Sequence, residues 1–281
     1  MMRALAPDVY HAVLTAVLPL LPQPAPDPLG RGRPRVSDEL CFKGIWVRLI
    51  TGSSWDTVEY LLNGAVSDTT LRARRDEWIT AGVFDQLVAE AWRAYDRIIG
   101  LDLGNVAIDG SQHRSPCGGE GTGYNPFDRG KLGWKWVMTV DANGIPLGWA
   151  TDGANRNDFA LLQDVMDVTV ANHDVVPIGR LHLDRGFSYK CTPKRLERFD
   201  ITELVMKPRG GRQGNKRKLV GLGGTWIVES ANSWFTNYGQ LRRSTDRKTI
   251  HRHTAISLAV TIIILGRLID HRDTYHRPRA A

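Results

Sequence analysis

Three acidic side chains stand where a carboxylate is costly unless something binds it. Asp109 and Asp184 each follow a short apolar run that predicts a strand, Val-Ala-Ile-Asp109 and Leu-His-Leu-Asp184. A charge at the end of a buried strand must be paired, hydrogen-bonded or bound to a metal. The third acid, Glu229, occurs in Trp-Ile-Val-Glu229 within a strongly basic part of the chain. Two strands and a helix are thus expected to bring three acids to one edge of a sheet.

Carboxylates from different elements that meet in this way suit magnesium, which prefers octahedral oxygen coordination and keeps several waters. Two such ions activate an attacking hydroxyl and stabilise the leaving oxygen of a phosphodiester. Any one aspartate taken alone is more often a helix cap or part of an ion pair. The combination of three acids with the basic side chains around Glu229 favours metal-dependent chemistry on nucleic acid.

Positive charge is concentrated near the third acid. The whole chain has a formal net charge of +7, whereas residues 205–253 alone contribute +9. The basic side chains of this window are Lys207, Arg209, Arg212, Lys216, Arg217, Lys218, Arg242, Arg243, Arg247, Lys248 and Arg252. A concentrated positive strip gains free energy on a polyanion by releasing its counterions. Double-stranded DNA is therefore the expected partner.

Composition limits the class of protein. Hydrophobic residues make up 42% and charged residues 24% of 281, which is typical of a globular chain and not of a disordered or collagenous one. The three cysteines are far apart and form no metal-binding or disulfide pattern. The apolar stretch 255–265 is too short for a membrane span and predicts a buried core helix. We expect a cytoplasmic protein that has no membrane partner.

The front third predicts an arm followed by helices. Residues 22–35 contain five prolines and two glycines, which neither a helix nor a strand can accommodate. Helices are predicted from the cap Ser37 to Gly52, from Trp55 to Leu62, from the cap Ser67 onward, and from 83 to 98. The second and third of these, joined by a turn at Asn63-Gly64, have the order of a helix-turn-helix, with Arg72 and Arg75 placed to contact DNA.

The pattern changes to β after Gly100. Strands are predicted at 105–109, 134–140, 145–151, 179–184 and 201–206, and helices near 157–166, 193–199 and from 228 onward. Asn143-Gly144 is expected to supply the positive φ angles of a hairpin turn. This order predicts an α/β fold in which helices pack on a mixed sheet.

At this point the motifs resemble a known family. The segments that carry the resemblance are Ile-Asp109-Gly-Ser, Leu-Asp184-Arg-Gly-Phe, Trp-Ile-Val-Glu229-Ser, Trp234-Phe-x-x-Tyr238, Leu241-Arg-Arg, Gly32-Arg-Pro-Arg, Thr51-Gly-Ser-Ser-Trp and Val140-Asp-Ala-Asn-Gly-Ile-Pro-Leu-Gly. Together they are similar to the DDE transposases of bacterial insertion sequences, family five, within the wider family-four superfamily. The resemblance spans roughly residues 30–268.

This resemblance implies a ribonuclease-H-like mixed sheet with flanking helices, preceded by a small all-helical domain. The expected organisation is an arm over 1–35, a helix-turn-helix-like DNA-binding domain over 36–98 and a catalytic domain over 99–281. Asp109, Asp184 and Glu229 would hold two Mg²⁺ ions, for which Mn²⁺ can substitute. Water would first attack the phosphodiester at the element's end, and the freed 3′-hydroxyl would then attack target DNA within a dimer or higher multimer.

The basic residues that we expect to hold DNA come from both halves of the chain. They are Arg72, Arg75, Lys207, Arg209, Arg212, Lys216, Arg242 and Arg243. Members of the family usually place arginine directly after the glutamate and a basic residue seven positions beyond it, whereas this chain has Ser230 and Thr236 there. Arg242 and Arg243 are candidate substitutes.

Two other functions fit the same residues. A related ribonuclease-H-like nuclease would cut DNA without joining it, and a strand-transfer assay with pre-cut ends separates that function from transposition. A DNA-binding regulator would use the helices at 55–80 and keep the acids for structure alone.

Overall fold

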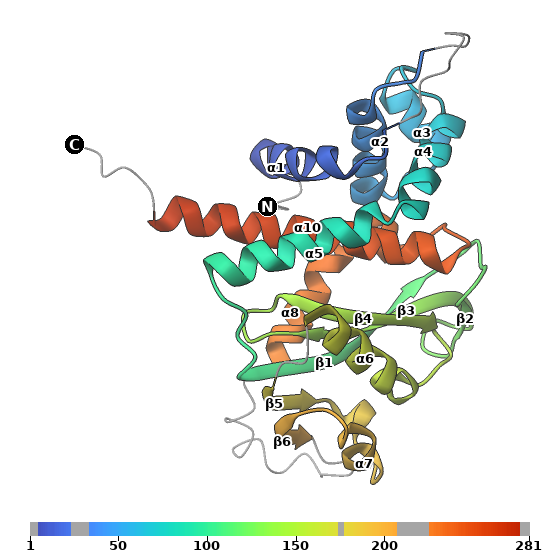
Figure 1. Cartoon of the computed structure of the whole chain (residues 1–281). Coiled ribbons are helices and arrows are strands. Elements are labelled where there is room, and N and C mark those ends of the chain that lie inside the picture. Colours follow the sequence, from blue (N-terminus) through green and yellow to red (C-terminus); the bar gives the residue numbers. More distant parts are fainter. Residues whose placement is uncertain (1–4, 24–33, 174–176, 207–224, 276–281) are drawn as a thin grey trace. The chain divides into compact units, whose positions relative to one another are not determined.

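The computed structural model describes residues 5–23, 34–173, 177–206 and 225–275 (Figure 1). The chain divides into two compact units, and neither is continuous in sequence. The helical unit comprises residues 1–99, 237–245 and 250–281, and the sheet unit comprises residues 100–236 and 246–249. The sheet unit thus begins one residue after the expected boundary at 99. The predicted catalytic domain over 99–281 needs correction, because the C-terminal segments group with the N-terminal helices.

The helical unit is built from helices of very different length. They are α1 (Pro7–Val17), η2 (Leu18–Leu20), α2 (Asp38–Thr51), α3 (Trp55–Leu61), α4 (Asp68–Thr80), α5 (Val83–Ile98), α9 (Gly239–Arg242) and nearly all of α10 (Thr249–Tyr275). Serine side chains cap three of them: Ser37, Ser54 and Ser67 each accept a hydrogen bond from the backbone N–H three residues later. The helix starts predicted at Ser37 and Ser67 are confirmed.

Helix α10 is the long apolar helix expected near the C-terminus. It is long and apolar enough to cross a membrane by length and composition, and it is the one such helix in the described part of the chain. A core helix of a soluble protein passes the same test, and 67% of its most apolar window is buried within the protein. Its burial includes a charged side chain, Arg252, which is 1% exposed.

In its described residues, the sheet unit contains six strands and five helical segments. The strands are β1 (Asn105–Arg114), β2 (Gly123–Asn125), β3 (Lys131–Val140), β4 (Pro146–Gly153), β5 (Ile178–Leu183) and β6 (Ile201–Met206). The helical segments are η3 (Asp158–Leu161), α6 (Leu162–His173), η4 (Arg185–Phe187), α7 (Thr192–Leu196) and α8 (Thr225–Thr236).

The sheet is mixed. Its order is β2-β3-β1-β5-β6, and β4 also pairs with β3. Strands β1, β3 and β4 pair antiparallel, whereas β5 lies parallel to β1 and β6 parallel to β5. The connection from β4 to β5 includes α6, and that from β5 to β6 includes α7. The predicted α/β class with a mixed sheet and flanking helices is confirmed, and the ribonuclease-H-like assignment stays a prediction.

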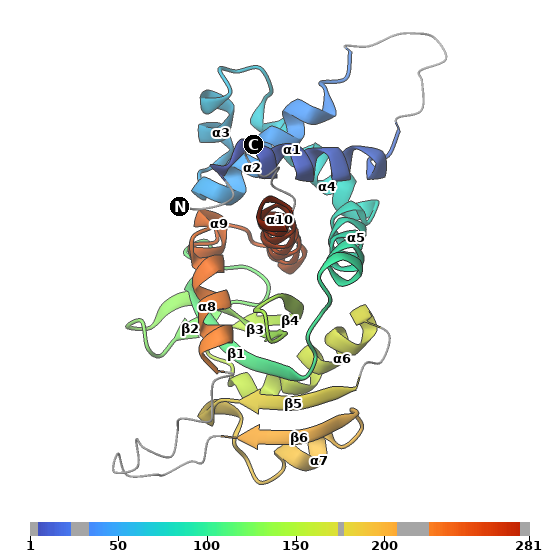
Figure 2. The same cartoon turned by 90° about the vertical axis from the view of Figure 1, so that its left-hand side faces the viewer.

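Two helices define the two faces of the sheet (Figures 1 and 2). On the α6 face, Ile108 and Leu183 join Leu162, Val165 and other apolar residues in a buried core. On the α8 face, Trp136 of β3 packs against Phe235 of α8 with ring centroids 5.9 Å apart. Because successive side chains of a strand point to opposite faces, each one lies either on the α6 face or on the α8 face.

The β3–β4 hairpin turns by a different device from the one expected. Gly144 has a φ of +79°, as predicted, but Asn143 is not among the residues with positive φ. The carboxylate of Asp141 makes the turn instead, because its Oδ1 accepts from the N–H groups of Asn143 at 2.9 Å and Ile145 at 2.7 Å. An aspartate side chain commonly holds its own turn in this way.

A close backbone approach joins α2 to α9 inside the helical unit. Gly52 ends α2 with a φ of +69°, and a Cβ added there would lie 2.5 Å from the carbonyl carbon of Gly239. Gly64 has the same φ of +69°, but a Cβ added there would meet nothing within 4 Å. The two glycines therefore separate the cost of the backbone conformation from the cost of the contact.

We expect Gly64→Ala to lower the free energy of unfolding by about 1–2 kcal/mol, since an L-residue in the left-handed region costs about that much. Gly52→Ala should cost about 1–3 kcal/mol more, because overpacking is added to the same conformational strain. Urea unfolding of both variants measures the difference. Equal destabilisation by the two substitutions would show that the approach of Gly239 is not held tightly.

Candidate active site

The pairing of β1 with β5 places two of the predicted acids side by side. Ile108 is the Cα partner of Leu183, and the strands run parallel, so Asp109 and Asp184 are the next residues on each. Ile108 and Leu183 both point into the core beneath α6. Alternation along the strands therefore puts Asp109 and Asp184 on the opposite face, which α8 covers.

Helix α8 brings the third acid to that same face. It packs on β1 and β3 (Figure 2). Its Asn232 donates a hydrogen bond from Nδ2 to Oδ2 of Asp109 at 3.1 Å. Glu229 is exposed and lies three residues before Asn232, on the same side of the helix. The structure thus brings Asp109, Asp184 and Glu229 to one face of the sheet.

The surroundings of Asp109 disfavour the ionised form of its carboxyl group. Burial, together with the negative charges of Asp184, Asp158 and Glu229, raises the pKa of Asp109 to about 6, although the backbone N–H of Gly110 opposes the shift. These are the effects that desolvation and nearby like charges have on an acid. The two other predicted acids, Asp184 and Glu229, are therefore close enough to Asp109 to disfavour its ionisation.

The donor set fits a divalent cation by its chemistry. Carboxylate oxygens are hard ligands, and a cation would relieve the repulsion that raises the pKa of Asp109. Within the described ranges, however, no three His, Cys, Asp or Glu side chains are arranged closely enough to hold a metal ion as they stand. The acids are neighbours on one face and do not form a ready-made cage.

A fourth acid, Asp158, lies behind this site and was not predicted. Its Oδ1 accepts a hydrogen bond from Nζ of Lys135, a lysine that is 1% exposed and also donates to the backbone oxygen of Arg156 at 2.7 Å. A Cβ added to Gly110 would lie 2.6 Å from the same Oδ1. Gly110 and Lys135 point away from α8, so Asp158 is placed on the α6 face, behind Asp109.

Neither Asp158 nor Asn232 carries a motif that sequence alone would single out. Asn157-Asp158 predicts a helix start, and Asn157 does cap η3 by accepting from the N–H of Phe159 at 2.9 Å. The partner of Asp158 is a lysine on another strand, which periodicity does not reveal. The position of Asn232, three residues after Glu229, is the signal that would have placed it beside the acids.

The basic residues predicted to hold DNA have different environments. Arg72 is exposed and pairs with Asp68 at 2.8 Å. Arg75 is buried, with its guanidinium 5.1 Å from the ring centroid of Trp55 and its Nε donating to Asp76. The structure thus gives Arg75 a packing role, because its guanidinium is enclosed. Arg242 and Arg243 are exposed, and Lys207, Arg209, Arg212 and Lys216 lie outside the described residues.

A second group of cations follows Asp184 directly and was not predicted. Five exposed basic side chains lie in this short stretch of the sheet unit, namely Arg185, Lys190, Lys194, Arg195 and Arg198. Arg195 stacks 4.3 Å from the ring centroid of Phe159, the residue after Asp158, and donates to its backbone oxygen. Arg198 pairs with Asp167. This cationic segment is the basic surface that lies nearest in sequence to a predicted catalytic acid.

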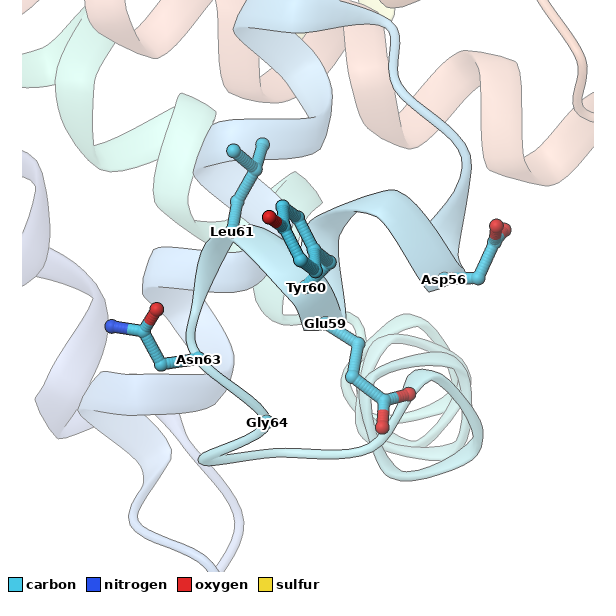
Figure 3. Close-up of a pocket in the computed structure, with 6 residues that line it drawn as sticks. All are labelled: Asp56, Glu59, Tyr60, Leu61, Asn63 and Gly64. Atoms are coloured by element: carbon cyan, nitrogen blue, oxygen red, sulfur yellow. The ribbon is translucent and has the colours of Figure 1, made fainter.

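A surface hollow on the helical unit is unrelated to these acids (Figure 3). Its lining residues are Asp56, Glu59, Tyr60, Leu61, Asn63 and Gly64. Glu59 accepts a hydrogen bond from the backbone N–H of Asp68 at 2.8 Å, so its carboxylate stabilises the start of α4. The lining contains no basic side chain, which does not suit a phosphate.

The sheet order and the acid-bearing face define an α/β protein with a mixed sheet and a candidate acidic site. Two proteins of Burkholderia cepacia share sequence with it. One, named as a transposase for insertion sequence element IS402, is 29% identical over 135 residues, which are 45% of this chain and 60% of that protein. The other, named as an uncharacterized 16.2 kDa protein of insertion element IS402, is 32% identical over 124 residues, 43% of this chain and 82% of that protein. The chain belongs to the family of these IS402 insertion-element proteins.

The chain spans less than two thirds of the first of these relatives, and no family model matches it. Two solved structures share part of its backbone arrangement. A piggyBac transposase synaptic complex with hairpin DNA gives a TM-score of 0.45 at 12% identity, covering 100% of this chain and 74% of that one. A Mos1 transposase paired-end complex with the left transposon end gives 0.29 at 9% identity, covering 85% and 80%.

The raised pKa of Asp109 makes a prediction about stability. A carboxyl whose pKa is higher in the folded than in the unfolded protein destabilises the fold as the pH rises from about 4 through 6. Without divalent metal, Asp109→Asn should therefore melt at a higher temperature than the parent protein at pH 7.5. The difference should shrink toward pH 4, where the parent carboxyl is protonated in the folded state and partly protonated in the unfolded state.

Thermal unfolding at the two pH values measures this difference. Asp56→Asn is the matched control, because hydrogen bonding to Ser54 lowers the pKa of the exposed Asp56. Its melting temperature at pH 7.5 should fall or stay unchanged. A lower melting temperature for Asp109→Asn at pH 7.5 would show that the Asp109 carboxylate is stabilised where it lies.

Proposed function

We propose that the chain is an insertion-sequence transposase that cuts the ends of a DNA element and joins them to target DNA. The observation that carries this proposal is the convergence of Asp109, Asp184 and Glu229 on the α8 face, where their charges raise the pKa of Asp109. The family relationship to the IS402 proteins, one of which is named as a transposase, supports it.

In this proposal the three carboxylates hold two Mg²⁺ ions, with Mn²⁺ as a substitute. Bound ions would lower the pKa of an attacking water and offset the charge that develops on the phosphodiester. Asp109, with a pKa of about 6, would be ionised at neutral pH and ready to bind a cation. Asp184 and Glu229 supply carboxylates from β5's end and from α8, so the site depends on the packing of that helix on the sheet.

The reaction divides into two displacements at phosphorus. Water replaces the bridging oxygen at the element's end and leaves a free 3′-hydroxyl. That hydroxyl then displaces a bridging oxygen of the target strand, so one phosphodiester forms as another breaks and no net oxidation occurs. Joining two ends requires two such sites, so we propose that a homodimer or higher multimer acts on double-stranded DNA.

The basic residues of the sheet unit would hold the DNA backbone beside the acids. Arg185, Lys190, Lys194 and Arg195 follow Asp184 closely and are exposed. The exposed Arg242 and Arg243 of the helical unit are proposed as further phosphate contacts. The hydroxyl of Thr236 donates to the backbone oxygen of Ser233 at 2.7 Å, so it serves its own helix in place of a basic side chain.

We expect Asp109→Asn, Asp184→Asn and Glu229→Gln each to reduce Mg²⁺-dependent cleavage of element-end DNA by at least about 10²-fold. Loss of groups that only support metal ligands already costs about 10–100-fold. Binding of the same DNA should persist. Glu203→Gln is the control, because Glu203 is exposed on β6 and pairs with Arg180. Full cleavage by any of the three acid variants would refute their assignment.

Pre-cut ends supplied to the wild-type protein test the second displacement. Transfer of the 3′-hydroxyl strand to a supercoiled plasmid is the expected outcome. Cleavage without joining would make the chain a nuclease. DNA binding without cleavage, in the wild type as in the acid variants, would favour a DNA-binding regulator.

The double substitution Lys190→Gln with Lys194→Gln should weaken DNA binding and flatten its salt dependence. Each phosphate contact contributes about −0.9 to the slope of log K against log salt on duplex DNA, so the slope should fall in magnitude by about 2. Fluorescence anisotropy across a salt series measures it. Arg180→Gln serves as the control, since Arg180 already pairs with Glu203, and an unchanged slope in the double variant would place DNA elsewhere.

A further inference from the structure

A buried amide connects the helix of the third acid to the first acid. Asn232 of α8 is 8% exposed and makes two hydrogen bonds with the sheet. Its Nδ2 donates to Oδ2 of Asp109 at 3.1 Å. Its Oδ1 accepts from the indole Nε1–H of Trp136 at 2.8 Å. One side chain thus bridges β3 and β1 from the helix above them.

The two partners of Asn232 fix the orientation of its amide. An indole N–H can only donate, so the amide oxygen must face Trp136. An ionised carboxylate can only accept, so the NH₂ group must face Asp109. Exchanging the two ends of the amide would break both bonds. The orientation is therefore set by the chemistry of Trp136 and Asp109.

Trp136 is itself held by contacts with three aromatic rings. It is fully buried, stacks on His113 with centroids 3.8 Å apart at 14°, and meets Trp134 edge-on at 5.2 Å. Burial lowers the pKa of His113 to about 3, so that ring stays neutral and apolar packing persists at working pH. Phe235 of α8 closes the cluster at 5.9 Å. The indole nitrogen is thus a fixed donor.

This chain of contacts relates Glu229 to Asp109. Residues three apart on a helix share a face, so a bond that fixes Asn232 also fixes the turn that carries Glu229. The same bond holds Oδ2 of Asp109 in place. A carboxylate that must bind a cation gains from such a support, because ligands held by hydrogen bonds do not have to be ordered on binding.

We propose that Asn232, oriented by Trp136, is a positioning residue of the acid site, which holds the Asp109 carboxylate and sets α8 with Glu229 against it. The proposal rests on the proposed function, since that function assigns the acids to metal binding. It gives Asn232 no contact with DNA and no part in proton transfer.

Two variants remove the hydrogen bonds of Asn232 and leave the three acids unchanged. Asn232→Leu keeps the approximate shape and removes both hydrogen bonds. Trp136→Phe keeps a ring in the aromatic cluster and removes only the donor that orients the amide. The controls are Ser233→Ala, an exposed neighbour on the same helix, and Trp134→Phe, the same substitution two residues away on β3.

The first measurement is Mn²⁺ binding to the full chain without DNA, followed by electron paramagnetic resonance of the free ion. We expect Asn232→Leu to weaken binding about 10-fold or more and Trp136→Phe to weaken it less, within the range found for residues that support metal ligands. The double variant should be no worse than Asn232→Leu alone, because Trp136 acts through Asn232. Both controls should bind as the wild type does.

The second measurement is the Mg²⁺ concentration that gives half-maximal cleavage. It should rise about 10-fold in Asn232→Leu, while DNA affinity and the rate at saturating Mg²⁺ change less. Wild-type Mn²⁺ binding and Mg²⁺ dependence in folded Asn232→Leu would overturn the proposal. If that variant does not fold, wild-type values in Trp136→Phe would overturn the orienting role of the indole.

Failure of the proposed function would look different. A wild-type protein that binds Mn²⁺ but never cuts DNA would refute the transposase proposal. The effect of Asn232→Leu on Mn²⁺ binding would still decide whether the amide positions the acids.

Discussion

The sheet unit depends on one electrostatic constraint, which is that like-charged carboxylates are held together on the face that α8 covers. Parallel pairing of β1 with β5 is what makes this arrangement unavoidable, because it aligns the residues that follow Ile108 and Leu183. The acids repel one another, and burial adds to the cost for Asp109. The apolar contacts beneath α6 must therefore outweigh a repulsion that lies on the other side of the same strands.

The back of the site shows how the chain limits that cost. The ion pair between Lys135 and Asp158 lies on the α6 face, where Gly110 leaves room for the Asp158 carboxylate. Any side chain at 110 would collide with that carboxylate. The glycine that follows Asp109 is thus explained by a neighbour more than forty residues later, and not by a turn, since it lies within β1. The glycine of the Asp109-Gly110 pair is therefore required by a tertiary contact with Asp158.

Local patterns predicted the elements that carry the acids, because apolar runs before aspartate and serine caps before helices have short-range causes. The strand end predicted at Asp109 was wrong, since β1 continues to Arg114 along its pairing with β3. Ser37 and Ser67 cap their helices as expected. Contacts between residues that are far apart in the sequence produce no such local pattern. The grouping of α10 with the N-terminal helices, the enclosure of Arg75 against Trp55 and the bridge made by Asn232 each depend on partners far away in sequence.

The charge pattern had the same limit. Counting lysines and arginines located a basic window, but a count cannot tell a guanidinium that faces solvent from one that stacks inside a helical unit. Arg74 and Arg75 are both buried, and Arg74 pairs with Asp38. The exposed cations after Asp184 are fewer than the basic residues of the predicted window. They were not predicted because acids such as Glu197 and Asp200 lower the net charge of this part of the sequence.

The discontinuity of the helical unit has a consequence for biosynthesis. Its first helices leave the ribosome long before residues 250–275, with which they are grouped, have been translated. Between those events the nascent chain carries an incomplete helical assembly and makes the whole sheet unit. A protein that is built in this order completes its helical unit only after α10 has been translated, and a premature stop codon anywhere upstream of α10 would release a product without a finished helical half.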